Sequence, residues 1–164
     1  MATKEIRVQR FSVTFSRSFR DVVAALEAAI GHPDMNSFTK SLAAAKTFAE
    51  VEKIVGGATG SKELMEFTRM DLSAVLRKRN GTEAGQSLRL IVGNPVIKSS
   101  MLQYVPDAGS YAPVTILVDE RADGVHLSYD RMASFLATYG SPEALKVAQD
   151  LDAKVEALLV TAAG

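Results

Sequence analysis

Apolar and polar residues alternate along the first part of the chain, over residues 6–15. A period of two places successive side chains on opposite faces of a strand, so this segment predicts a strand with one buried face. After Ser18, which suits a helix N-cap, apolar positions recur with the 3.6-residue period of an amphipathic helix over residues 19–30. Gly31 and Pro33 are expected to end that helix.

The pattern over residues 32–60 is helical but broken into two short pieces, residues 36–46 and 47–54, with Gly56-Gly57 ending the second. Few large apolar residues occur in this stretch. We therefore expect a helical insertion that lies outside the main core.

The rest of the chain switches between short apolar runs and helical patterns. Asp123-Gly124 separates two of the runs, and this dipeptide between apolar segments is typical of a tight β-hairpin. The predicted strands cover residues 64–70, 88–92, 114–119 and 125–129, and the predicted helices cover residues 72–79, 95–104, 131–139 and 142–162.

These elements predict one domain over residues 1–164, of the α+β class, with an antiparallel sheet and helices packed on one face. The hairpin makes two strands adjacent and antiparallel, and the helices can then cover one side of the sheet. A chain of 164 residues buries roughly 70% of its unfolded surface, so one hydrophobic core is sufficient for stability.

The last predicted helix, at about residues 142–162, is an extra C-terminal element with a narrow apolar seam. The seam consists of Ala144, Ala148, Leu151, Val155, Leu158 and Ala162. Such a seam packs either against the chain's own core or against a partner subunit. Its shortness and alanine content favour the chain's own core, and the surface that it offers also motivates our prediction of a homodimer.

Composition narrows the function classes. Lys and Arg total 19, as do Asp and Glu, and this zero net charge argues against nucleic-acid binding. The absence of cysteine excludes thiol catalysis and thiolate metal sites and agrees with a reducing compartment. No apolar run approaches the ~20 residues of a membrane span, and the first fifteen residues lack a signal-peptide core. We therefore expect a cytoplasmic protein with no membrane partner.

His126 shares one strand face with Ser128 and Asp130, and Asp119 lies on the preceding strand. His126, Asp119 and Asp130 are thus the candidate catalytic residues of a hydrolase or isomerase. Residues two apart on a strand stand roughly 7 Å apart, however, which is too far for the direct hydrogen bonds of a catalytic relay. We therefore expect His126 not to be catalytic.

A second hypothesis for the same hairpin is a cation site formed by His126 with Asp119, Glu120 and Asp123. Acidic residues next to a tight turn are commonly turn formers that remain solvated. We therefore expect neither a metal nor a cofactor.

Gly93, Asn94 and Pro95 mark a junction where a strand runs directly into a helix. Asn is a good N-cap and Pro a good first helical residue. Free N–H groups at a helix N-terminus attract anions, so these three residues are the candidate ligand-binding site. The alternative is an ordinary junction in which the Asn94 side chain satisfies the helix donors.

Four segments together resemble the family named domain of unknown function 302. They are Met70-Asp-Leu-Ser-Ala-Val-Leu, Ile91-Val-Gly-Asn-Pro95, the Ala112-Pro113 pair before a strand, and Val125-His-Leu-Ser-Tyr-Asp130. The resemblance covers residues 6–30 and 64–137; the insertion and the C-terminal helix depart from the family pattern. It implies a TATA-binding-protein-like α+β fold and a common tendency to dimerise, and it supplies no activity.

The sequence therefore predicts a binding or structural homodimer with a small-molecule ligand, here an anion at residues 93–95. The alternative is a hydrolase or isomerase with a carboxylate-histidine pair at a subunit interface. The two differ in whether a concave site with convergent polar groups is present.

Overall fold

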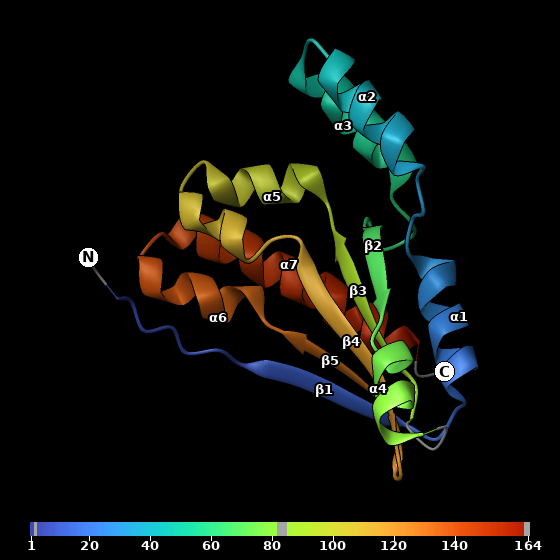
Figure 1. Cartoon of the computed structure of the whole chain (residues 1–164). Helices are drawn as coiled ribbons and strands as arrows, with labels where there is room; N and C mark the ends of the chain where they lie inside the picture. Colours follow the sequence, from blue (N-terminus) through green and yellow to red (C-terminus); the bar gives the residue numbers. More distant parts are fainter. Residues whose placement is uncertain (2, 82–84, 163–164) are drawn as a thin grey trace.

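An antiparallel sheet of five strands lies at the centre of the fold, in the order β1-β5-β4-β3-β2 (Figure 1). The computed structural model describes residues 1, 3–81 and 85–162. The strands are β1 (Arg10–Phe15), β2 (Met65–Asp71), β3 (Ser87–Gly93), β4 (Val114–Arg121) and β5 (Gly124–Asp130). The α+β class, the antiparallel sheet and the hairpin at Asp123-Gly124 are confirmed.

The first strand is shorter than its apolar alternation predicts. We expected a strand from residue 6, but β1 begins at Arg10, which pairs with Asp130 at the end of β5. No strand residue remains on β5 for residues 6–9 to pair with. Gln9 instead bonds to the segment after β5: its N–H donates to Ser134 Oγ, and its carbonyl accepts from Arg131.

The helices begin where local capping residues place them. Ser18, Asp34, Thr47, Asn94 and Ser141 each accept a hydrogen bond from a backbone N–H of the following first turn. The helices are α1 (Phe19–Ala29), α2 (Met35–Ala44), α3 (Phe48–Ala58), α4 (Ser73–Asn80), α5 (Pro95–Leu102), α6 (Met132–Leu136) and α7 (Pro142–Thr161), with short 3₁₀ turns η1 (Pro106–Ser110) and η2 (Ala137–Tyr139). None of the described helices is long and apolar enough to cross a membrane.

The main core lies between one face of the sheet and helices α1, α5, α6 and α7, as Figure 1 shows for the last three. Strands β1, β4 and β5 send every second side chain into it. The seam on α7 is buried completely in this core. The hypothesis that the seam forms a partner interface is therefore wrong, because the chain's own helices and sheet cover it.

Helices α2 and α3 form a hairpin that projects away from the sheet (Figure 1). The expected end of α3 before Gly56-Gly57 is wrong, since the helix continues to Ala58, and Val55 and Ala58 pack against Phe38 and Met65. These contacts stabilise a helical turn that its two glycines disfavour.

The chain enters and leaves this hairpin through two close backbone crossings. A Cβ atom at Gly31 would lie 2.0 Å from the carbonyl oxygen of Ala58, and one at Gly60 would lie 2.2 Å from that of Ala29. Only glycine fits at either position. The two glycine N–H groups both donate to the Leu64 carbonyl, at 2.9 Å, which ties the base of the hairpin to the start of β2.

The opposite side of the sheet is here called the open face, and among the described residues only Met65, opposite Gly93 at the start of β2, joins a hydrophobic core cluster from this side. Its other side chains come from the alternate positions of the same strands and are half-buried or exposed. They are Arg10, Ser12, Thr14, Thr68, Met70, Arg89, Ile91, Thr115, Leu117, Asp119, His126, Ser128 and Asp130.

Candidate functional site

The three candidate catalytic residues lie on the open face, but the sheet register separates them. His126 lies opposite Asp119 of β4 and Thr14 of β1. Asp130 lies four residues along β5, which corresponds to about 13 Å. It accepts two hydrogen bonds from Arg10, at 2.7 and 2.9 Å. Asp119 is therefore the only one of the two carboxylates next to the imidazole.

Both ring nitrogens of His126 already have polar partners. Nε2 lies 2.8 Å from Asp123 Oδ1, and Nδ1 lies 3.2 Å from Thr14 Oγ1. The hydrogen bond to His126 lowers the pKa of Asp123. The side chain of His126 is only 13% exposed, so these contacts fix the ring at the base of the hairpin.

The two carboxylate oxygens of Asp119 differ in their hydrogen bonding. Oδ2 accepts from Arg121 Nε, while the buried Oδ1 has no hydrogen-bond partner in the described part of the chain. The geometry thus places a carboxylate beside His126 without a direct bond between them. A catalytic role for His126, Asp119 and Asp130 stays a prediction.

The predicted ligand site at residues 93–95 is a tightly bonded junction between β3 and α5. Asn94 Oδ1 accepts from the N–H groups of Val96 and Ile97, at 2.9 and 3.2 Å, and Asn94 Nδ2 donates to the Glu63 carbonyl at 2.9 Å. The enclosed space beside it measures about 10 Å³, which holds at most one water molecule. Anion binding here stays a prediction, and the donors that it needs are already bonded.

A larger groove, of about 470 Å³, lies at the end of the open face where β4 begins. Arg89 and Thr115 line it from the sheet, and Tyr111 and Phe135 line it from the segment before β4 and from α6. The two rings are stacked, with centroids 4.6 Å apart and planes 11° apart. The groove therefore places an aromatic wall near a guanidinium group.

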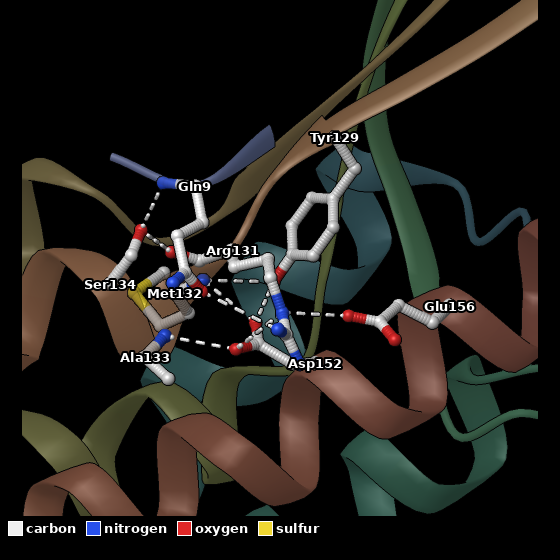
Figure 2. Close-up of polar contacts among 8 residues, drawn as sticks. All are labelled: Gln9, Tyr129, Arg131, Met132, Ala133, Ser134, Asp152 and Glu156. Carbon is white, nitrogen blue, oxygen red and sulfur yellow. Dashed lines mark hydrogen bonds and ion pairs between the residues drawn. The ribbon is translucent and has the colours of Figure 1, made fainter. Parts of the chain in front are cut away.

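A buried polar cluster on the covered side of the sheet joins β5, α6 and α7 (Figure 2). Its centre is Asp152 of α7, which is 1% exposed. The Asp152 carboxylate accepts from the N–H groups of Met132 and Ala133, at 2.7 and 3.0 Å, and from the Tyr129 hydroxyl. Helix α6 has no side-chain cap of its own, so a residue twenty positions away caps it.

Arg131 and Glu156 extend this cluster toward the surface. Arg131 Nε lies 2.8 Å from Glu156 Oε1 as an ion pair that is not aligned as a hydrogen bond, and 3.9 Å from Asp152 Oδ2. Burial and then the charge of Asp152 raise the pKa of Tyr129 well above its ordinary value, so its hydroxyl stays protonated and donates. The cluster leaves no free oxygen on Asp152 for a ligand and is structural.

The sequence carried one signal for this cluster. Asp152 lies on the apolar face of α7, four residues after Ala148 and three before Val155. A charged residue within an apolar seam indicates a buried partner. The identity of the partners depends on how α6 packs on α7.

Among the residues that the structure describes, no three side chains of His, Asp or Glu come together as a group able to hold a metal ion.

Comparisons with known proteins give a family and a fold. The sequence profile of the family described as "Domain of unknown function DUF302" matches residues 38–162. A crystal structure of an uncharacterised conserved DUF302 protein from Bacillus stearothermophilus superposes with a TM-score of 0.64 at 13% sequence identity, covering 93% of this chain and 97% of that one. No curated protein matches the chain. At this identity the structural likeness concerns the fold alone.

Proposed function

The chain belongs to the family of domain of unknown function DUF302, whose description assigns no activity, and we propose that it acts as a homodimeric binding domain without covalent chemistry. The observation that carries this proposal is the open face, whose side chains, apart from Met65 at the start of β2, lie outside both core clusters of the described residues. Sheets with one covered and one free side are common, but the free side is then usually polar throughout.

Three apolar side chains lie on the open face as diagonal neighbours on adjacent strands. Ile91 on β3 is diagonal to Leu117 on β4 and to Met70 on β2, and Arg89 lies directly opposite both of these residues. Asp119 and Asp130 lie on β4 and β5 toward the two ends of the face. Apolar side chains together with arginine are found in protein interfaces, in which arginine is enriched.

A second copy of the chain is the occupant that the face fits best. The face carries both charge signs and the chain has zero net charge, so two copies do not repel each other. Five strands of about seven residues project roughly 600 Å², somewhat less than the ~800 Å² per partner of a standard interface. Helix α4 adjoins β3 through Ser73 and Ser87 and adds exposed apolar side chains, of which Val75 is 74% exposed.

The alternative, a hydrolase or isomerase, is favoured by one observation. Asp119 lies opposite His126 in the register, its Oδ1 has no hydrogen-bond partner among the described residues, and a residue of a second subunit would complete the pair. The bonds of His126 to Asp123 and Thr14 favour the non-catalytic proposal.

Three more specific predictions from the sequence are part of this proposal. They are the likeness to the TATA-binding-protein fold, the anionic ligand at residues 93–95 and the cytoplasmic location. The helices packed on one side of an antiparallel sheet support the first.

Sedimentation equilibrium tests the proposal. We expect the chain to be a dimer at about 50 µM, and Leu117→Lys to sediment as a monomer with an unchanged far-UV circular dichroism spectrum, because a buried unpaired charge disrupts an interface. Val160→Lys, on an exposed position of α7, is the matched control and should remain dimeric. A monomeric parent chain, or a Leu117→Lys variant that still dimerises, would contradict the proposal.

A further inference from the structure

The groove at the end of the open face has the size and lining of a small-ligand site. Its volume of about 470 Å³ lies within the roughly 300–1,000 Å³ of small-molecule pockets. Its lining residues come from β3, β4, β5, α6 and the segment before β4.

Arg89 supplies the positive charge of the groove. Its Nη2 donates to the Thr115 hydroxyl at 3.2 Å, and no carboxylate of the described residues lies within ion-pair distance of its guanidinium. The other charged lining residue, Asp130, is neutralised by two hydrogen bonds from Arg10. A planar guanidinium without an anionic partner is a fork that binds a carboxylate through two hydrogen bonds.

Tyr111 and Phe135 supply the apolar wall. Their rings are stacked, and the Tyr111 hydroxyl is hydrogen-bonded to the Tyr139 hydroxyl at 2.7 Å, which fixes the orientation of the pair. Both residues are half-buried, and both line the groove. A fixed aromatic surface favours contact with a planar apolar group.

We propose that this groove binds a small organic carboxylate with a planar apolar body, whose carboxylate pairs with Arg89 and whose body lies against Tyr111 and Phe135. The ligand class follows from two features of the groove: the Arg89 guanidinium, which has no carboxylate partner among the described residues, and the aromatic surface of Tyr111 and Phe135. The inference does not rest on the proposed dimer, although a second copy on the open face would cover the open side of the groove.

Benzoate is a suitable probe, with benzamide as its neutral counterpart and benzylammonium as its cationic one. Calorimetric or NMR titration should give a dissociation constant of about 1 mM for benzoate, as expected for a ligand of this size. Benzamide and benzylammonium should bind at least about tenfold more weakly, because neither offers Arg89 a carboxylate.

The variant Arg89→Gln should weaken benzoate binding about tenfold or more without lowering the melting temperature, since Arg89 is exposed and makes one hydrogen bond. Arg20→Gln, an exposed arginine on α1, is the matched control and should bind benzoate like the parent chain. The affinity of Arg89→Lys for benzoate should lie between those of Arg89→Gln and the parent chain. Lysine keeps the positive charge but cannot donate two parallel hydrogen bonds to a carboxylate.

The inference is overturned if benzoate does not bind at about 20 mM, if benzamide binds equally well, or if Arg89→Gln binds benzoate like the parent. Should Arg89→Gln fail to fold, the comparison of benzoate with benzamide on the parent chain decides. Sedimentation of the same samples separates this test from that of the dimer. If benzoate binds to a monomer, only the dimer proposal is refuted. If the chain is a dimer that does not bind benzoate, only the ligand site in the groove is refuted.

Discussion

The two faces of the sheet are formed by alternate residues of the same strands, yet they differ in how completely their polar groups are bonded. On the covered face, the buried carboxylate of Asp152 accepts three hydrogen bonds. On the open face, Asp119 has an oxygen with no partner among the described residues, and Arg89 is bonded only to a hydroxyl. On the covered face, the Asp152 carboxylate has its partners within the chain, and Arg131 Nε and Glu156 Oε1 beside it are joined as an ion pair although neither is hydrogen-bonded. On the open face, by contrast, a carboxylate oxygen and a guanidinium have no charged partner among the described residues.

The difference concerns function because stability and binding make opposite demands on polar groups. A buried polar group without a partner destabilises the fold, and the Asp152 carboxylate accordingly accepts from one hydroxyl and two backbone N–H groups, while Arg131 beside it is paired with Glu156. A binding surface needs groups that are free until the ligand arrives. Groups that remain available to a ligand therefore lie on the open face, whereas the Asp152 carboxylate is already bonded.

The largest expected effect is the loss of Asp152. Asp152→Ala leaves the Tyr129 hydroxyl and the Ala133 N–H without an acceptor, and the Met132 N–H with only the Tyr129 hydroxyl oxygen. It should lower the free energy of unfolding by about 3–5 kcal/mol, since each unsatisfied buried group costs ~1–3 kcal/mol. Urea unfolding followed by circular dichroism measures the change.

Asp150→Ala is the matched control on the same helix, because the Asp150 side chain is 61% exposed and pairs only with Lys146. Its expected cost is below about 0.5 kcal/mol. If both variants lost the same stability, Asp152 would not hold the cluster together.

The second effect compares one leucine on each face. Leu127 of β5 is fully buried, so Leu127→Ala should destabilise the monomer by about 2–5 kcal/mol through the cavity that it leaves. Leu117 of β4 lies half-buried on the open face, and Leu117→Ala should lower the free energy of unfolding by under ~1 kcal/mol in solutions too dilute for the proposed dimer to form. Denaturant unfolding at low protein concentration measures the free energy of unfolding of both variants. Equal losses would mean that Leu117 is packed as tightly as Leu127, so that the open face would not be open.

The smallest effect concerns Asn94, whose Oδ1 satisfies two donors of α5 and whose Nδ2 holds the Glu63 carbonyl. Asn94→Ala should lower the free energy of unfolding by about 1 kcal/mol, the usual cost of a lost N-cap. Asn36→Ala, at an exposed position of α2, is the control and should be close to neutral. Thermal unfolding measures the stability of both variants. If Asn94→Ala were as stable as the parent chain, the side-chain cap would not contribute to stability.

The sequence by itself determined the elements whose signals are local. The caps Ser18, Asn94 and Ser141 act on N–H groups two or three residues away, and the Asp123-Gly124 turn joins neighbouring strands, so short-range patterns were sufficient. The antiparallel sheet and the candidate residues on one face of β5 followed from the same period-two pattern.

Only the tertiary structure decided which segments found partners. The alternation over residues 6–9 gave no strand because β5 ends opposite Arg10, and α3 passed through Gly56-Gly57 because Val55 and Ala58 have apolar contacts on other elements. Asp152 caps a helix twenty residues away, and Arg89, Tyr111 and Phe135 line one groove because three separate segments converge there. Such groupings depend on contacts between residues far apart in the chain, which no local pattern encodes, and the groove and the open face belong to this class.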